Sequence, residues 1–339
     1  MTALSDAITR QPRARVATLP TPLEPGPELA GGARLWIKRD DLTGLGVGGN
    51  KARKLEFLCG AARAEGADTL ITVGAAQSNH CRMTAAAGAV LGLPVHLVLG
   101  GSAPAAPTGN QLLSELFGAH LHFAGTSDWT ALESAAADLE RRLRLDGRVP
   151  YLIPIGGSTA TGAIGFAAAA SELLDQSEAL GVTPRAVVHA TSSGGTHAGL
   201  LAGFAVEAAA GRVAPEVLAI GVAPGVIAHR EHASHLARAC LDRLGLRGEF
   251  AIGAGEVIAD YLGRDYAVPT AAGDAAIVEA ARVGGWVLDR VYTGKAYAGL
   301  LGMSRAGRWA RGDDVVFWHT GGLPSVFAPG GLPPAPAVS

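Results

Sequence analysis

The feature that most constrains the fold is a regular alternation of short apolar runs with longer, helix-like stretches, which begins near residue 34. Runs such as 69–73 and 95–99 have the length and composition of buried strands. The stretches between them, such as 51–65 and 80–91, contain no proline and are long enough to form helices. Alternating strands and helices predict open, mostly parallel sheets with helices on both faces.

The same pattern predicts the individual elements. Strands are expected at 34–39, 69–73, 95–99, 121–123, 151–155, 186–190, 217–222 and 315–318. Helices are expected at 51–65, 80–91, 111–117, 131–145, 164–180, 197–209, 228–244, 272–283 and 295–305. Residues 1–30 are rich in proline and show little periodicity, so they are predicted to form an irregular arm with one short helix.

Composition excludes several classes of partner. The net charge of -2 gives no electrostatic basis for binding nucleic acid or an acidic membrane surface. The apolar runs are all shorter than the roughly 18 residues that a membrane-spanning helix needs, and the first residues do not resemble a signal peptide. Cys59, Cys81 and Cys240 are scattered, which is typical of a protein in the reducing cytoplasm.

One stretch, 44–58, joins a glycine-rich loop to the start of a predicted helix. Its glycines allow the backbone to turn tightly and to approach a ligand closely. A loop that leads into a helix N-terminus is a common anion site. Lys51 and Lys54 lie three residues apart on one face of this helix. Because cations at a helix N-terminus oppose the helix dipole, we expect an anion to bind between them.

This stretch matches two known phosphate-binding motifs superficially, and both fail on context. In the dinucleotide fingerprint the glycines follow their strand directly, whereas residues 39–41 intervene here, and Asp68 precedes a strand instead of ending one. In a P-loop the last glycine and the lysine are adjacent, whereas Asn50 precedes Lys51 here. Binding of NAD or ATP is therefore not expected.

A third interpretation makes the lysine the chemical centre. Positive charge near Lys51, from the helix dipole and Lys54, favours loss of its proton, and a neutral amine is a Schiff-base nucleophile. A second glycine loop, 191–196, opens another predicted helix and offers hydroxyls and backbone N–H groups to a phosphate. A reactive lysine combined with a phosphate loop suggests pyridoxal phosphate as the cofactor.

Further polar residues follow other predicted strands, where ligands bind in parallel sheets. Residues 77–80 (QSNH) join a strand to a helix and suit a substrate carboxylate, although an N-cap also explains Ser78 or Asn79. Tyr266 and Tyr292 are two of only five tyrosines, and Thr320 follows the last strand.

A histidine repeat, by contrast, predicts no metal site. His229, His232 and His235 recur every three residues on one helix, so their side chains spread around it by about 60° per step and do not converge. A solvated helix face explains them.

Five motifs together resemble the D-cysteine desulfhydrase / 1-aminocyclopropane-1-carboxylate deaminase family, a branch of the tryptophan-synthase-β-like (fold type II) pyridoxal-phosphate enzymes. The motifs are 48–56, 77–80, 193–199, 292–296 and 319–322. The resemblance implies two open, mostly parallel twisted sheets flanked by helices, and a homodimer. We expect a large cofactor-binding domain formed by 1–47 and 163–339, and a small α/β domain formed by 48–162.

The resemblance also implies which residues bind the cofactor. Lys51 would form the Schiff base, Asn79 would hydrogen-bond the ring hydroxyl, and Thr320 would meet the ring nitrogen. A hydroxyl at that nitrogen leaves it largely unprotonated, which favours elimination. The phosphate would be bound by Lys54, Ser193, Gly194, Gly195 and Thr196.

The implied reaction is α,β-elimination, which gives pyruvate, ammonia and, from D-cysteine, sulfide. Lys51 would accept the Cα proton, with Ser78 as the alternative acceptor, and Tyr266 or Tyr292 would steer or protonate the leaving group. No metal is required. Substrate contacts are expected from Gln77, Ser78, Asn79, His80, Tyr266, Tyr292 and Thr293.

Three alternatives remain open. Ring-opening deaminases of this family carry a glutamate where Thr293 stands, so Thr293 and His80 favour the D-cysteine desulfhydrase branch. A sulfonate leaving group, as in L-cysteate sulfo-lyases, is the second alternative, with His229 and Arg230 as candidate contacts. The third is a relic that binds an amino acid without the cofactor, against which the intact lysines and phosphate loop argue.

Overall fold

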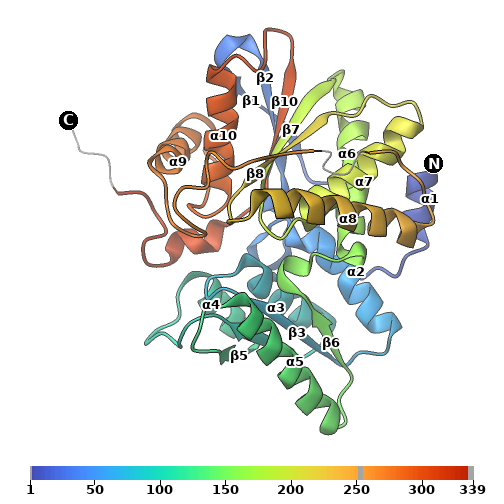
Figure 1. The fold of residues 1–339 in the computed structure, drawn as a ribbon, viewed down its shortest axis with the longest axis vertical. Coiled ribbons are helices and arrows are strands. Elements are labelled where there is room, and N and C mark those ends of the chain that lie inside the picture. Colours follow the sequence, from blue (N-terminus) through green and yellow to red (C-terminus); the bar gives the residue numbers. More distant parts are fainter. Residues whose placement is uncertain (1, 251–254, 335–339) are drawn as a thin grey trace.

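A computed structural model describes residues 2–250 and 255–334 of the chain (Figure 1). It contains a six-stranded sheet with the order β1-β2-β10-β7-β8-β9 and a four-stranded sheet with the order β5-β4-β3-β6. The larger sheet consists of β1 (Leu23–Glu28), β2 (Arg34–Arg39), β7 (Pro184–Thr191), β8 (Glu216–Gly221), β9 (Glu256–Ile258) and β10 (Asp314–His319). The smaller sheet consists of β3 (Thr69–Gly74), β4 (Val95–Leu99), β5 (His120–Phe123) and β6 (Pro150–Ile153).

Every neighbouring pair of strands is parallel except β1 and β2. Helices lie on both faces of each sheet, so the predicted fold class is confirmed (Figure 1). The helices are α1 (Ala3–Thr9), α2 (Lys51–Ala64), α3 (Asn79–Leu91), α4 (Gly109–Leu116), α5 (Trp129–Leu145), α6 (Ala160–Leu180), α7 (Gly195–Ala209), α8 (Val226–Leu244), α9 (Ala271–Gly284) and α10 (Thr293–Arg305).

The packing of the larger sheet explains why the sequences of its inner strands are continuous apolar runs. Along β10, Val316 and Trp318 pack toward α6, α7 and α8, whereas Val315 and Phe317 pack toward α9 and α10. Because successive side chains of a strand point to opposite faces, a sheet covered on both faces needs apolar residues at every position. Each of these four side chains is at most 1% exposed.

The smaller sheet is built in the same way. Leu70 and Leu97 pack toward α2 and α3, and Ile71 and Val98 pack toward α5. Helix α2 therefore lies beside the smaller sheet, and it also contacts α6 beside the larger sheet. The domain boundaries expected from the sequence, after residues 47 and 162, stay a prediction.

Two strands were not predicted from the sequence pattern. Residues 23–28 (LEPGPE), expected to be irregular, form β1, which pairs antiparallel with β2 at the edge of the larger sheet. An edge strand tolerates proline because one row of its backbone groups needs no partner. The other edge strand, β9, is three residues long, too short to show a period. Within the described ranges, no helix has the length and apolar character needed to cross a membrane.

Candidate active site

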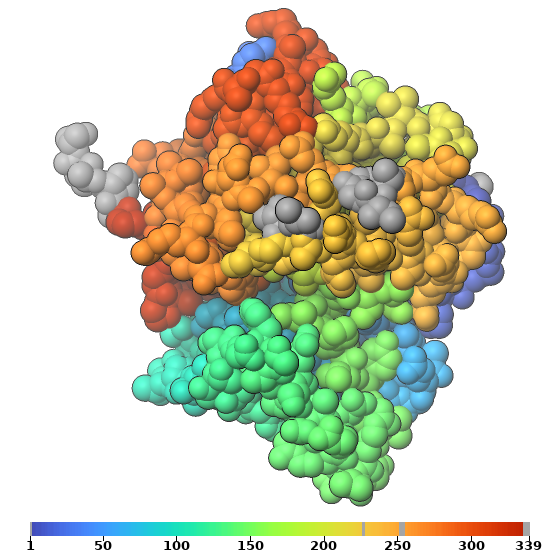
Figure 2. Space-filling view, viewed as in Figure 1, coloured from blue at the N-terminus to red at the C-terminus, as the bar shows by residue number. Residues whose placement is uncertain are grey.

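A cavity of about 440 Å³ opens between the parts of the molecule that hold the two sheets. Its walls come from loops that follow β3, β6, β7 and β10 and from the starts of α2, α5 and α8. In the space-filling view the α8 surface faces the α5 surface across this junction (Figure 2). Many of the site residues predicted from the sequence line this cavity. They are Lys51, Lys54, Ser78, Asn79, His80, Ser193, Gly194, Gly195, Thr196, Tyr266, Tyr292 and Thr320.

Lys51 is the first residue of α2, and its Nζ lies 3.1 Å from Asn50 Oδ1, to which it donates. The pKa of Lys51 is lowered to about 8, chiefly by burial and also by the nearby Arg82 charge, while Asp289 opposes the shift. An amine with this pKa is substantially neutral just above physiological pH, as a Schiff-base nucleophile must be. The sequence argument attributed the shift to Lys54 and the helix dipole, whereas burial is the largest cause.

Arg82 holds the glycine loop in place, and sequence reasoning missed it. This fully buried guanidinium donates to the backbone oxygens of Gly46 and Gly48, and to Asn110 Oδ1 at 3.0 Å. Gly48 has a φ of +77°, and a Cβ there would lie 1.9 Å from the Asp41 carbonyl oxygen. The glycine is therefore required by backbone crowding as well as by conformation.

Lys54 is a buried lysine that has no carboxylate partner among the residues that the structure describes. Its Nζ donates to the Gly156 carbonyl at 3.1 Å and to Ser158 Oγ at 3.3 Å. Burial and the charge of Lys51 hold the pKa of Lys54 well below its ordinary value. A buried lysine that has only neutral acceptors gains from an anionic ligand, which would restore its charged form.

The loop before α7 completes this anion cradle. Gly194 has a φ of +78°, and α7 begins at Gly195, whose N–H donates to Ser158 Oγ at 3.1 Å. A Cβ on Gly195 would lie 2.6 Å from Ser158 Oγ and 2.8 Å from Lys54 Nζ, so a side chain would fill the cradle. Ser158, which donates to Ser193 Oγ at 2.8 Å, was not predicted. Ser158 could have been predicted from its position, because it follows strand β6 and other loops of the site also follow strands.

Asn79 and Thr320 both line the cavity, where their polar groups can serve a bound ring. Asn79 Oδ1 accepts from Asn110 Nδ2 at 2.9 Å and from Arg82 at 3.4 Å. This fixes the amide so that its Nδ2 hydrogens remain for a ligand. Thr320 follows β10 at the cavity wall, and its backbone oxygen accepts from the Asn50 N–H at 3.0 Å.

His80 is a neutral imidazole whose tautomer is fixed by its neighbours. Thr72 Oγ1 donates its one proton to the Ile153 carbonyl at 2.8 Å, so it must accept from His80 Nε2, which is 2.9 Å away. Burial, with the charges of Lys51 and Lys54, holds the pKa of His80 well below its ordinary value. Nδ1 is therefore an unprotonated acceptor, and it has no partner in the described part of the chain.

The two predicted tyrosines form a pair. Tyr266 and Tyr292 share a hydrogen bond of 2.5 Å between their hydroxyl oxygens. Burial raises the pKa of both phenols, so both are protonated at neutral pH and one hydroxyl proton is available to the cavity. Ser78 lines the same cavity and also caps α3, because its Oγ accepts the Cys81 N–H at 3.2 Å.

Gln77 and Thr293 lie behind the cavity wall. The Gln77 amide accepts from the Asn110 N–H and donates to the Thr108 carbonyl, 2.9 and 3.0 Å away. The Thr293 hydroxyl donates to Asp289 Oδ2 at 2.8 Å. Neither side chain is part of the cavity lining, so their hydrogen bonds favour a supporting position, and direct contact with the substrate stays a prediction.

The residues present fit pyridoxal phosphate. The cradle of Lys54, Ser158 and Gly195 suits the phosphate. Any side chain at position 195 would fill the space that the phosphate needs. Lys51 offers the amine for the aldehyde, while Asn79 and Thr320 offer hydrogen-bonding groups to the ring. These are the groups that a lysine-bound, phosphate-anchored cofactor needs.

Comparison with known proteins identifies the class. Residues 15–321 match the family model described as "Pyridoxal-phosphate dependent enzyme", and the chain belongs to this family. It is 40% identical to the D-cysteine desulfhydrases of Salmonella typhi and Salmonella choleraesuis, over 95% of this chain and 97% of each relative.

Solved structures agree with this assignment. A structure described as an ACC deaminase homologue has a TM-score of 0.89 and 35% identity, and covers 97% of this chain and 98% of its own. The structure of maize serine racemase has a TM-score of 0.66 and 16% identity over 94% of this chain and 92% of its own, which shows the shared fold.

The pKa of Lys51 predicts how the cofactor-free enzyme should capture pyridoxal phosphate. Only the neutral amine attacks the aldehyde, so the rate should rise with pH and level off above about 8. An unperturbed lysine would require a pH above about 10. Stopped-flow absorbance of the lysine-bound cofactor across roughly pH 6.5 to 10 measures the midpoint. A midpoint near 10 would contradict the neutral-amine assignment.

Proposed function

We propose that this protein is a pyridoxal-phosphate-dependent carbon–sulfur lyase that acts on D-cysteine or a closely related β-substituted alanine. The products would be pyruvate, ammonia and sulfide. The observation that carries the proposal is Lys51, an amine with a pKa of about 8 that lies in a cavity beside a phosphate cradle. The D-cysteine desulfhydrases at 40% identity over almost the whole chain support the choice of substrate.

The residues of the chain divide the work as follows. Lys54, Ser158 and the loop before α7 hold the phosphate, and the fixed Asn79 amide and Thr320 orient the ring. When bound, pyridoxal phosphate supplies an electron sink for the electron pair released at the substrate Cα. Ser78, at the N-terminus of α3, meets the substrate carboxylate, which a helix N-terminus attracts.

Proton transfer is assigned to Lys51 and the tyrosine pair. Lys51 Nζ accepts the Cα proton, since its lowered pKa keeps it neutral near the working pH. Ser78 is the alternative acceptor. Tyr266 and Tyr292 are protonated and share one hydrogen bond, so one phenol steers or protonates the departing sulfur.

The alternatives are distinguished by their products. A 1-aminocyclopropane-1-carboxylate deaminase gives 2-oxobutyrate, and the 35% identical ACC deaminase homologue keeps this activity a candidate. An L-cysteate sulfo-lyase gives pyruvate, ammonia and sulfite. A relic without the cofactor would show none of these activities.

The reconstituted enzyme should therefore be incubated separately with D-cysteine, L-cysteine, L-cysteate and 1-aminocyclopropane-1-carboxylate. Pyruvate, sulfide, sulfite and 2-oxobutyrate are measured in each reaction. We expect pyruvate and sulfide in equal amounts from D-cysteine, and the highest kcat/KM for that substrate. Formation of 2-oxobutyrate alone would mean that Thr293 does not mark the substrate class.

We also propose that the enzyme works as a homodimer in the cytoplasm. The family resemblance supports the dimer, and the three cysteines, all buried and free, support a reducing compartment. Light scattering coupled to size-exclusion chromatography measures the mass in solution, which is expected to be twice the chain's 34.3 kDa.

A further inference from the structure

The active-site cavity has a buried inner end and an exposed mouth. Lys54, at the inner end, is 1% exposed, whereas Trp129, the first residue of α5, is 40% exposed. The Trp129 ring meets the Tyr266 ring edge to face, with 6.0 Å between ring centroids. Glu133, one turn later on α5, and Asp265, beside Tyr266, are exposed and line the same mouth.

Glu133 is the carboxylate whose charge is not offset. Asp289 accepts four hydrogen bonds, from the N–H groups of 291–293 and from the Thr293 hydroxyl. Asp265 accepts the Tyr266 N–H, and Lys295 Nζ lies 3.4 Å from its backbone oxygen. Glu133, by contrast, has no hydrogen bond or ion pair within residues 2–250 and 255–334.

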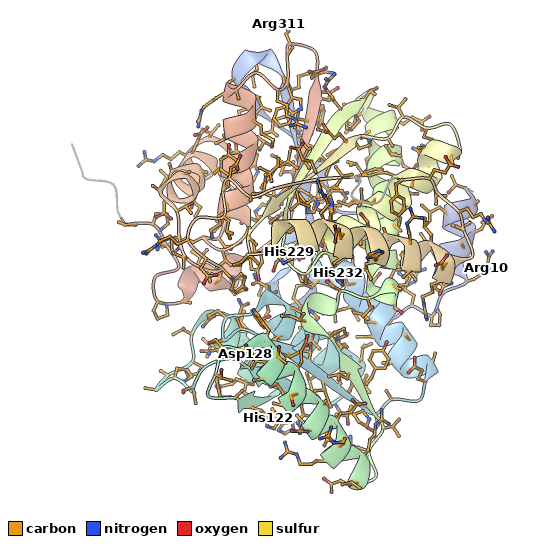
Figure 3. All side chains as sticks on the ribbon, viewed as in Figure 1. Arg10, His122, Asp128, His229, His232 and Arg311 are labelled. Atoms are coloured by element: carbon orange, nitrogen blue, oxygen red, sulfur yellow. The ribbon has the colours of Figure 1, made fainter. Side chains whose placement is uncertain are left out.

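The opposite side of the mouth does not supply a full positive charge. His229 on α8 lines the cavity, and burial, with His232 nearby, lowers its pKa, so it is neutral at pH 7. Arg230 is not part of the lining. Figure 3 shows His229 and His232 on α8 and Asp128 at the start of α5, on the two sides of the junction. Asp128 caps α5 and adds negative charge on the Glu133 side.

We propose that Glu133 is a specificity-determining residue, which selects substrates with a neutral or cationic β-substituent and disfavours those with an anionic one. This inference rests on the proposed function, because it concerns the substrate class of the same site. It separates D-cysteine, whose thiol is neutral, from cysteate, whose sulfonate is anionic. Of the two sulfonate contacts that the sequence left open, His229 lines the cavity, whereas Arg230 does not.

The physical basis is a charge that solvent screens only in part. In the proposed function Lys54 pairs with the phosphate, and Lys51 serves first the cofactor bond and then the Cα proton. Neither lysine is left as a counter-ion for an extra anion on the substrate, which meets Glu133 without compensation. Glu133 also attracts the ammonium group that every amino-acid substrate carries. Because Glu133 is exposed, we expect a moderate effect, about three- to tenfold in binding, and one that decreases with salt.

A pair of isosteric ligands isolates the charge. Aspartate and asparagine differ only in the charge of the side-chain head group, and both enantiomers of each are titrated into the holoenzyme by calorimetry. Wild type should bind asparagine more tightly than aspartate. In Glu133→Gln this preference should decrease about three- to tenfold. Glu140→Gln is the matched control, because Glu140 lies on the same helix outside the cavity, paired with Arg144.

The proposal is overturned if wild type shows no preference, if Glu133→Gln leaves the preference unchanged, or if Glu140→Gln changes it equally. A parallel assay compares D-cysteine with D- and L-cysteate, and Glu133→Gln should raise the relative kcat/KM for cysteate. If D-cysteine is not converted at all, the proposed function fails, while the calorimetric comparison still decides the role of Glu133.

Discussion

Replacing Lys51 with alanine is expected to lower kcat/KM for D-cysteine by roughly a thousandfold or more, since in the proposed function this one side chain provides both the cofactor bond and the proton acceptor. The absorbance band of lysine-bound pyridoxal phosphate should be missing from this variant, even at saturating cofactor. The fold should be preserved, because within the described residues Lys51 makes a single side-chain hydrogen bond, to its neighbour Asn50. Circular dichroism tests whether the fold is preserved, and the absorbance band tests whether the cofactor is bound to the lysine.

Lys54→Met provides the matched control on the same helix. Lys54 contacts Gly156 and Ser158 in the cradle, so its loss should weaken cofactor affinity by about tenfold to a hundredfold, as expected for a charged hydrogen bond. At saturating cofactor the absorbance band should return. If Lys51→Ala kept the band, or stayed within about tenfold of wild-type activity, Lys51 would not be the cofactor lysine.

Most of the fold could be predicted because the sheets are covered on both faces. Strand β4 at Val95–Leu99 was predicted to the residue, since a buried parallel strand is a mostly apolar run between helices. Strand β2 at Arg34–Arg39 was also predicted to the residue, although charged residues stand at both of its ends. The edge strands β1 and β9 could not be found in this way. Their residues are half-buried or exposed, and each is placed by pairing with one neighbouring strand, β1 with β2 and β9 with β8.

The site could be predicted where the chemistry is local. Lys51 at the end of the glycine loop, the loop before α7 and Thr320 all line one cavity. Residues that act through long-range contacts were missed. Arg82 and Asn110 orient the Asn79 amide from α3 and α4, and Ser158 joins the phosphate loop from the loop after β6. No spacing in the sequence marks such contacts.

Arg53 is another residue whose role only the structure shows. It lies between Lys51 and Lys54 in α2, yet its guanidinium points away from the cavity, into a buried charged network. It donates to both Asp40 oxygens at 2.8 to 3.0 Å and to both Glu172 oxygens at 2.8 and 2.9 Å. Asp40 follows β2 and Glu172 lies on α6, so Arg53 joins the start of the lysine-bearing helix to the larger sheet.

The network also makes stability depend on pH. Burial would raise the pKa of Glu172, but the hydrogen bonds and charges of Arg53 and Lys38 hold it at about 2. A carboxyl whose folded pKa is depressed stabilises the fold above its unfolded pKa, near 4.5, and this contribution is lost as pH falls toward 2. Unfolding by urea should therefore become easier as the pH falls from 4.5 to 2.

Replacing Arg53 with methionine should destabilise the protein by about 3–5 kcal/mol, because the fully buried Asp40 carboxylate loses its ion-pair partner and the half-buried Glu172 keeps only Lys38. Methionine keeps much of the side-chain volume, so an unpaired buried charge causes the loss. Arg144→Met removes an exposed pair with Glu140 and should cost about 0.5 kcal/mol or less. Urea unfolding of both variants at about pH 7 and about pH 4 measures the difference. We expect a large loss of unfolding free energy in Arg53→Met alone, and a smaller loss at the lower pH. Equal losses in the two variants would mean that the network does not hold α2.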